Sequence, residues 1–271
     1  MEHILDINDI SKSFASSYGR NKVFGSEYKN VIDGLSIQLG RGKITSLVGG
    51  NGAGKTTLFN LISGLLRPDQ GDILLSPGPA SIDCTQASPW QIASAGVGRL
   101  FQGSRIFGPL TVLDHLLIQA RPDIVESPFY SLFYPRQSRK TNKDLLDQIY
   151  QEMNQYDEFL ELWHDRSKPA SSLSYARQRL LSMAGLMLGG YELLLLDEPS
   201  SGLSHESIDL MYQYLDVMRQ RGKTVFLIEH NMKFIHQAAD ECHFMAGGKI
   251  RYSGTPGEVL GQAEVKQSYL L

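Results

Sequence analysis

A glycine-rich run that ends in lysine and threonine constrains this chain more than any other feature of its sequence. The run Gly49-Gly50-Asn51-Gly52-Ala53-Gly54-Lys55-Thr56 fits the pattern GxxxxGK[ST] of a phosphate-binding loop. Glycines let the backbone wrap so that successive N–H groups face phosphate oxygens, and the following helix adds its N-terminal dipole. The lysine brings a positive charge to the β- and γ-phosphates, and the threonine hydroxyl is a ligand for Mg²⁺. The run therefore predicts a site for ATP and Mg²⁺.

The segments around this loop predict an α/β core. Residues 44–48 are a short β-rich run that ends at the glycines, and residues 54–65 have the pattern of a helix. Residues 193–196 and 225–228 are continuous apolar runs, as expected of strands buried on both faces of a parallel sheet. Residues 205–221 fit a crossover helix between these two strands.

The remaining segments are less regular. Residues 2–10 alternate apolar and polar and predict a strand, and residues 14–30 predict a surface loop or a hairpin tip. Residues 121–170 hold few glycines and many charges, and apolar side chains at helical spacing over 144–164 predict a helix there. We interpret this part as a helical subdomain, the alternative being a long surface excursion.

Two carboxylates follow the apolar run at 193–196. Asp197 and Glu198 would stand at the carboxyl end of a buried strand, the edge at which open α/β sheets bind ligands. Asp197 is suited to hold Mg²⁺, usually through water, and Glu198 is suited to polarise the attacking water as a general base. The alternative, a strand that simply ends in acidic surface residues, is disfavoured by the phosphate loop in the same chain.

Bulk properties exclude several classes of protein. Over 271 residues, 26 basic and 29 acidic side chains give a net charge of −3, so bulk charge does not favour nucleic acid as a partner. Two cysteines form no zinc pattern and no disulfide framework, which favours a reduced, cytoplasmic compartment. The first residues lack the features of a signal peptide, and the longest apolar stretch, 180–196, is interrupted by glycines and Glu192. We therefore expect no membrane-spanning segment.

With these motifs in place, nearly the whole chain resembles the ATP-binding cassette (ABC) family. Phe101-Gln102 matches the Q-loop of that family, and His230 after the run at 225–228 matches the H-loop. Ser201-Gly202-Leu203 resembles the D-loop, and Leu173-Ser174 opens the signature motif, which in this family reaches across a dimer to the partner's ATP. Taken alone, Gln102 would not attract attention, and His230 would pass for a histidine in a strand-to-helix turn.

The resemblance implies a fold and a set of site residues. The fold is an α/β P-loop ABC ATPase fold with an antiparallel β-subdomain and an inserted helical subdomain, in one domain over 1–271. Residues 1–100 and 192–271 would form the nucleotide-binding core, and residues 101–191 the helical subdomain. The catalytic residues would be Glu198, His230 and Gln102. The metal ligands would be Thr56, Gln102 and Asp197. The nucleotide contacts would be Gly49, Gly50, Asn51, Gly52, Ala53, Gly54, Lys55, Thr56, Thr57, Phe14, Ser174, Tyr175 and Ala176.

Within the family, the sequence is most similar to the ATPases of importers for branched-chain or other hydrophobic amino acids, or for urea. The matching stretches are residues 56–65, 98–102, 110–113 and 228–232, with Tyr175. The resemblance implies integral-membrane permease subunits as partners, a second ATPase subunit, and a location at the cytoplasmic face of the cell membrane. The aromatic residues near 129–134 would help to dock the permease, or would belong to the core of the subdomain or to a mobile loop.

Departures from the family pattern cluster in the signature half-site. Ala176 stands where the family has Gly, and Arg177 where Gln or Glu is common. Gly185 replaces the usual Arg, the pair 189–190 replaces a more rigid turn, and Ser204 replaces the Asp or Asn of the D-loop. Because the phosphate-loop half-site is complete, the hypothesis that follows is a heterodimer whose partner supplies an ordinary signature.

Three questions stay open at this level. Phe14 is the first choice to stack on adenine, with Tyr18, Phe24 and Tyr28 as rivals. A soluble ABC ATPase without a membrane partner is one alternative function, although the chain lacks a second cassette, a long coiled coil and a basic patch. A nucleotide sensor with little turnover is the other, and the intact Glu198 argues against it.

Overall fold

The computed structural model describes residues 2–15, 28–78, 81–103, 106–120, 135–203 and 205–269. The chain divides into two compact units. The first unit comprises Met1–Arg99, Glu192–Ser201 and Ile208–Leu271. The second unit comprises Leu100–Tyr191 and Gly202–Ser207.

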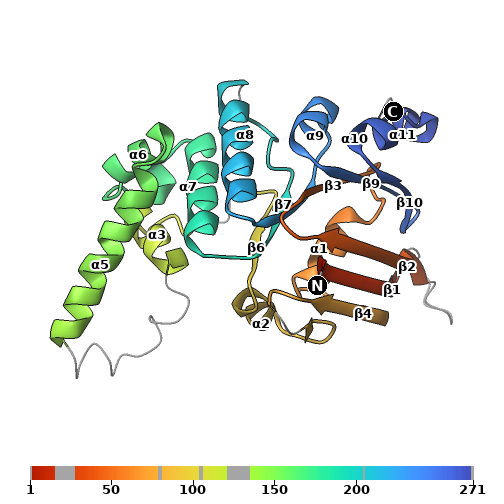
Figure 1. Cartoon of the computed structure of the whole chain (residues 1–271), viewed down its shortest axis with the longest axis horizontal. Helices are drawn as coiled ribbons and strands as arrows, with labels where there is room; N and C mark the ends of the chain where they lie inside the picture. Colours follow the sequence, from red (N-terminus) through yellow and green to blue (C-terminus); the bar gives the residue numbers. More distant parts are fainter. Residues whose placement is uncertain are drawn as a thin grey trace, which may run out of the picture. The chain divides into compact units, whose positions relative to one another are not determined.

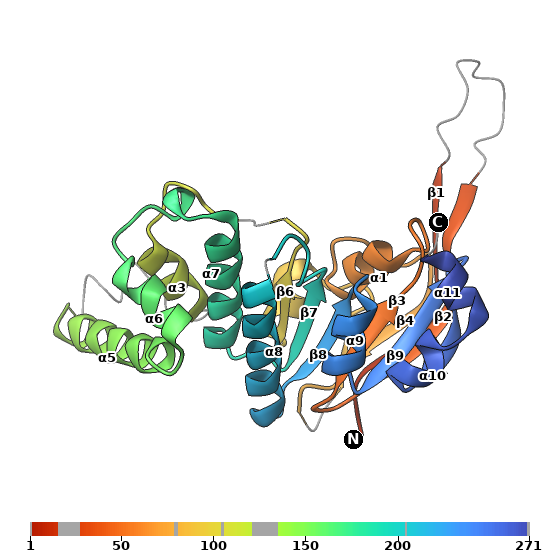
Figure 2. The same cartoon turned by 90° about the horizontal axis from the view of Figure 1, so that it is seen from above.

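A largely parallel sheet forms the centre of the first unit (Figure 2). Its strands are β3 (Ile44–Val48), β6 (Val97–Leu100), β7 (Leu193–Asp197), β8 (Thr224–Ile228), β9 (Glu241–Ala246) and β10 (Lys249–Gly254), in the order β10-β9-β3-β8-β7-β6. β8 pairs in parallel with both β3 and β7, and every residue of these three strands is buried. The apolar runs of the sequence are therefore strands, as predicted, and their carboxyl ends lie side by side.

A second, antiparallel sheet belongs to the same unit (Figure 1). Its strands are β1 (His3–Ala15), β2 (Tyr28–Gly40), β4 (Gln70–Leu75) and β5 (Ile82–Asp83), in the order β2-β1-β4-β5. β1 runs beyond the predicted 2–10, and Ala15 pairs with Tyr28. The segment predicted as a loop or hairpin tip therefore joins two long strands, and its residues 16–27 lie outside the described part.

Helix α1 (Lys55–Ile62) packs into the core that the two sheets share. Its apolar residues belong to one buried cluster with side chains of β1, β2, β7 and β8, and Phe59 contacts the Phe226 ring with centroids 5.1 Å apart. The other helices of this unit are α2 (Pro89–Ser94), α8 (His205–Gln220), α9 (Met232–Ala238), α10 (Pro256–Leu260) and α11 (Ala263–Ser268). α8 confirms the predicted crossover helix.

The second unit is helical. It holds α3 (Val112–Ala120), α5 (Pro135–Met153), α6 (Asp157–His164), the 3₁₀ turn η1 (Ala170–Ser172) and α7 (Tyr175–Leu188). The helical structure predicted over 144–164 is confirmed, but it is divided between α5 and α6 by a bend at which Tyr156 is extended. The apolar spacing continues across the bend since both helices bury one face, and spacing alone does not show the break. No helix of the described residues is long and apolar enough to span a bilayer.

Candidate functional site

The phosphate loop wraps between β3 and α1, as its sequence predicts. Gly52 and Gly54 have φ of 76° and 107°, in the left-handed region that glycine adopts without strain. A Cβ on Gly54 would lie 2.8 Å from the carbonyl oxygen of Val31, and one on Gly49 would lie 2.3 Å from that of Met245. Gly54 therefore requires glycine for space as well as for backbone conformation, and Gly49 requires it for space.

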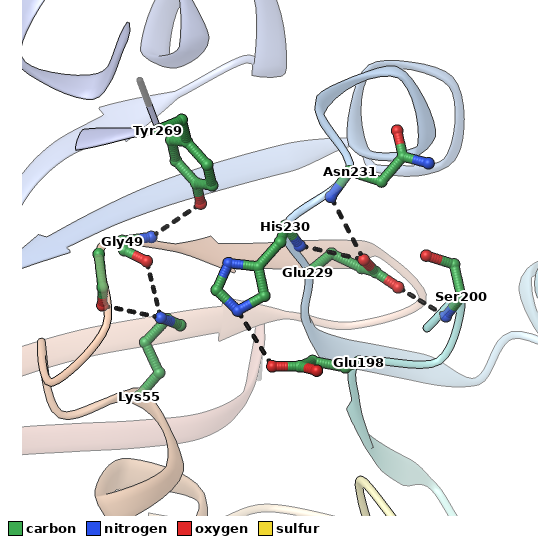
Figure 3. Close-up of polar contacts among 9 residues, drawn as sticks. Gly49, Lys55, Glu198, Ser200, Glu229, His230, Asn231 and Tyr269 are labelled. Atoms are coloured by element: carbon green, nitrogen blue, oxygen red, sulfur yellow. Dashed lines mark hydrogen bonds and ion pairs between the residues drawn. The ribbon is translucent and has the colours of Figure 1, made fainter. Parts of the chain in front are cut away.

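Lys55 closes the loop on itself. Its Nζ donates hydrogen bonds to the carbonyl oxygens of Gly49, at 2.7 Å, and of Gly50, at 3.0 Å (Figure 3). The side chain is buried, and burial lowers the pKa of its amine, while the charges of Glu198 and Asp197 oppose that shift. The cation is held by main-chain oxygens beside two carboxylates, where it can meet phosphate. Of its neighbours in sequence, Thr56 and Asn51 are exposed and Thr57 is half-buried.

The two carboxylates occupy different environments. Asp197 is the last residue of β7 and is buried. Burial raises the pKa of Asp197, and Glu198 raises it further, whereas Arg99 and Lys55 oppose the shift. Glu198 follows at φ 49°, an uncommon conformation for a residue other than glycine, and its N–H donates to Ile228 O at 2.9 Å. Backbone strain of this kind clusters at functional sites.

His230 meets Glu198 at the ends of neighbouring strands. Its Nε2 lies 3.0 Å from Glu198 Oε1 (Figure 3). The histidine follows β8 and the glutamate follows β7, so the parallel pairing of these strands brings the two side chains together. The structure thus joins two residues that the sequence separates widely, and it does so beside the lysine of the phosphate loop.

Two polar residues of this unit were missed by the sequence analysis. The buried Glu229 carboxylate accepts hydrogen bonds from the N–H groups of Ser200, at 2.7 Å, and of His230, at 3.0 Å. It thereby ties the turn after β8 to the turn after β7. Arg99, at the end of β6, lies 3.6 Å from Asp197 across a buried ion pair. Arg99 lies shortly before Gln102 in the sequence, which places it near a predicted site residue, but nothing in the local sequence indicates that its charge is buried.

The predicted signature residues lie in the second unit. Ser174 is the N-cap of α7, and its hydroxyl accepts from the N–H of Arg177. Arg177 is not a free cation, because Nη1 lies 2.6 Å from Asp165 Oδ2. The exposed Tyr175 and the half-buried Ala176 follow the cap on the first turn.

The Q-loop residue Gln102 is held by main-chain contacts within the same unit. The buried Arg179, also missed at the sequence level, donates to Gln102 O at 3.1 Å and lies 3.3 Å from the hydroxyl of Tyr175. Arg179 thereby links the first turns of α7 to the Q-loop. In the sequence, only its position a few residues after the signature motif could have pointed to this role. The glycines of α7 also fit their surroundings. A Cβ on Gly185 would lie 2.8 Å from Gln119 Cγ of α3, so the arginine usual at this position would require the Gln119 side chain to move.

Two expectations concern adenine and Mg²⁺. Phe14 lies at the end of β1 with Lys12 Nζ 5.9 Å from its ring centroid, and both Phe14 and Tyr28 are exposed. Thr56, Asp197 and Gln102 each carry a side-chain oxygen, the type of metal ligand that Mg²⁺ prefers, and Asp197 ends a strand beside the phosphate loop. The residues Tyr18, Phe24, Phe129, Tyr130, Phe133, Tyr134 and Ser204 lie outside the described part of the chain.

Comparisons with known proteins agree with this geometry. A family model described as ABC transporter matches residues 32–201. The high-affinity branched-chain amino acid transport ATP-binding protein LivG of Salmonella typhimurium is 32% identical over 247 residues, which cover 88% of this chain and 91% of that protein. The lipopolysaccharide export system ATP-binding protein LptB of Haemophilus influenzae is 28% identical over 269 residues, which cover 98% of this chain and 97% of that protein.

A solved structure shares the fold. The crystal structure of the ADP conformation of an ATP-binding cassette of an ABC transporter superposes with a TM-score of 0.77 at 27% identity, covering 100% of this chain and 99% of that one. The sheet order, the phosphate loop and the helical unit described above are thus those of a P-loop ABC ATPase fold, as predicted.

Proposed function

The chain belongs to the ABC transporter family as an ATP-binding, ATP-hydrolysing subunit, and from this premise we propose that Lys55, Glu198 and His230 act in one half of a composite hydrolysis site. The observation that carries the proposal is the 3.0 Å contact between His230 and Glu198 at strand ends beside the phosphate loop. Residues 1–100 and 192–271 act as the nucleotide-binding core, and residues 101–191 as the helical subdomain.

Each residue has one task in this proposal. Lys55 exchanges its contacts with Gly49 O and Gly50 O for the β- and γ-phosphates of ATP. The water oxygen bonds to the γ-phosphorus while Glu198 takes a proton from that water, and the bond from the γ-phosphorus to the bridging oxygen breaks, so that ADP leaves. His230 orients Glu198 through Nε2 and contacts the γ-phosphate. Thr56, Asp197 and Gln102 are the Mg²⁺ ligands of this proposal, and the ion when bound would neutralise charge on the phosphates.

The second half of the composite site comes from another ATPase subunit. Ser174, Tyr175 and Ala176 of this chain face the partner's ATP in a head-to-tail dimer. The methyl group of Ala176 stands where a glycine N–H approaches phosphate, which weakens that half-site, whereas the charge of Arg177 is compensated by Asp165. We therefore favour a heterodimer whose partner has an ordinary signature.

The dimer drives transport through integral-membrane permease subunits at the cytoplasmic face of the membrane. The similarity to branched-chain amino acid transport ATP-binding proteins supports import of branched-chain or other hydrophobic amino acids. The similarity to LptB defines the competing outcome, lipopolysaccharide export. The complex that co-purifies with the tagged chain, reconstituted in liposomes, should hydrolyse ATP faster with leucine and its binding protein than with lipopolysaccharide. Stimulation by lipopolysaccharide alone would contradict import of amino acids and would favour lipopolysaccharide export.

The composite site is tested by mixing variants of this chain. Glu198→Gln should lower ATP turnover by about 10²–10⁴-fold, as removal of a general base does. A repaired signature, Ala176→Gly with Arg177→Gln, is then placed on the Glu198→Gln chain. This protein has no general base of its own, but it offers a good signature to a wild-type phosphate loop.

Mixing it with wild-type chain should raise turnover above that of either protein alone, with a steep dependence on protein concentration. The matched control is the same mixture with Glu198→Gln lacking the repair, which should dilute the wild-type activity. Equal activities of the two mixtures would contradict the composite site, and full turnover of Glu198→Gln would contradict the role of Glu198.

A further inference from the structure

Tyr269, directly after α11, contacts the phosphate loop and the H-loop from outside every motif described so far. Its hydroxyl oxygen accepts a hydrogen bond from the N–H of Gly49 at 3.1 Å. Its ring meets the His230 ring edge-on, with centroids 6.1 Å apart and planes at 62°. Figure 3 shows the tyrosine approaching the phosphate loop on one side and the histidine on the other.

The amide that Tyr269 binds stands at a structurally sensitive place. β3 ends at Val48, whose register partner in β9 is Phe244, so Gly49 is the first residue of the loop beyond the sheet. The carbonyl oxygen of the same Gly49 accepts from Lys55 Nζ at 2.7 Å. One peptide unit on each side of Gly49 is thereby tied, to the tyrosine through N–H and to the lysine through C=O.

The helix before Tyr269 is anchored in the core of the first unit. Val265 of α11 is fully buried in a cluster that includes Val48, Phe244 and Val259, and Tyr269 packs against this cluster. Burial raises the pKa of the Tyr269 phenol to about 12, so it stays neutral at physiological pH. An anchored, neutral aromatic side chain can hold its neighbours in place without adding charge to the phosphate site.

We propose that Tyr269 is a positioning residue of the ATPase, whose hydroxyl holds the first amide of the phosphate loop and whose ring sets the orientation of His230. The two functions separate in the side chain: the hydroxyl acts on nucleotide binding through Gly49 and Lys55, and the ring acts on turnover through His230 and Glu198. This inference rests on the function proposed above for His230 and Glu198.

The test compares Tyr269→Phe with Tyr269→Leu. Phenylalanine keeps the ring and removes the hydrogen bond, so kcat should stay within about twofold while the Kd for a fluorescent ADP analogue rises about fivefold, the equivalent of one hydrogen bond. Leucine keeps apolar volume but removes the ring as well, so kcat should fall about tenfold or more, as misplacement of a catalytic group does.

Tyr252 offers a matched control on the same side of the molecule. It also packs in the α11 cluster, stacks on Phe244, and donates its hydroxyl to Glu264 at 3.1 Å, away from the phosphate loop. Tyr252→Phe and Tyr252→Leu should lower the melting temperature as the Tyr269 variants do, but leave kcat and the Kd for ADP unchanged.

The outcomes decide the proposal. Equal kcat for Tyr269→Leu and wild type, or equal losses at Tyr252 and Tyr269, would overturn it. The ADP measurement needs no turnover, so it remains informative even if Glu198→Gln were to hydrolyse ATP normally and the proposed hydrolysis site were wrong.

Discussion

Replacing Arg99 with methionine should destabilise the first unit more than any surface substitution, because it leaves a buried carboxylate without its main partner. The side chains of Arg99 and Asp197 are only 7% and 4% exposed, with Nη2 and Oδ2 3.6 Å apart. Arg99 Nη1 also donates to Asn60 Oδ1 at 2.8 Å and to Ser63 Oγ at 2.6 Å. Removing one member of a buried ion pair costs about 3–5 kcal/mol. Since Lys55 partly compensates Asp197, we expect the lower end of that range.

The cost should depend on pH in one direction. Burial already raises the pKa of Asp197 above 3.8, and Arg99 opposes that shift, so the variant raises this pKa further. A carboxyl whose pKa is higher in the folded than in the unfolded protein binds more protons when folded, and its penalty grows as pH rises from the unfolded value through the folded one. The difference between wild type and variant should therefore be smallest near pH 4 and largest at neutral pH, by about 1.4 kcal/mol for each unit of added shift.

The assay is native-state hydrogen exchange on peptides from β7 and β8, which reports the opening free energy of the first unit by itself. The control is Lys43→Met, which breaks an exposed pair with Glu241 and should cost at most about 1 kcal/mol. In an Asp197→Asn background, Arg99→Met should cost clearly less, because the carboxylate charge is already gone. An equal cost in both backgrounds, or no pH dependence, would refute the ion-pair reasoning.

Three further predictions follow from single contacts. Burial lowers the pKa of His243 below 6.5, so as pH falls the unfolded chain binds the proton before the folded chain does. The free energy of unfolding should therefore fall below about pH 6.5, with a slope of up to about 1.4 kcal/mol per pH unit. Urea titrations of His243→Gln should lack this slope, and an unchanged slope would contradict the prediction. Arg179→Leu removes the buried donor that contacts Gln102 O and the Tyr175 hydroxyl, so it should speed hydrogen exchange in the peptide that contains Gln102. Arg179→Lys should restore part of the protection. Equal exchange in both variants would argue against a role of Arg179 in holding the Q-loop. Gly189→Ala would place a Cβ 2.3 Å from the Tyr191 ring. It should lower the melting temperature by several degrees, because overpacking costs about 1–3 kcal/mol. The control Gly78→Ala, whose Cβ would have nothing within 4 Å, should leave the melting temperature unchanged; similar melting curves for both variants would show that the Tyr191 ring moves aside freely.

The sequence by itself determined the parts of this protein that depend on local pattern. Glycine spacing and the lysine that follows specify a phosphate loop, because backbone freedom and charge are properties of the residues themselves. Continuous apolar runs specify β7 and β8, because strands buried on both faces of a sheet carry mostly apolar side chains, and the short β-rich run before the glycines specifies β3, although it buries Thr45 and Ser46. Asp197 and Glu198 were placed at a strand end for the same reason. The departures from the family pattern at Ala176 and Arg177 were also visible in the sequence alone.

Only the tertiary structure decided which distant residues meet. Tyr269 and Gly49 are 220 positions apart, and no local pattern links them, because their contact depends on where α11 packs against the end of β3. The charges of Arg99, Arg179 and Glu229 look like ordinary surface charges in the sequence, and their burial follows from helices and strands closing over them. The bend between α5 and α6 is decided likewise, since both helices bury an apolar face and the periodicity is satisfied with or without the break. Pattern fixes what each segment can become, whereas burial and long-range pairing fix which side chains share a site.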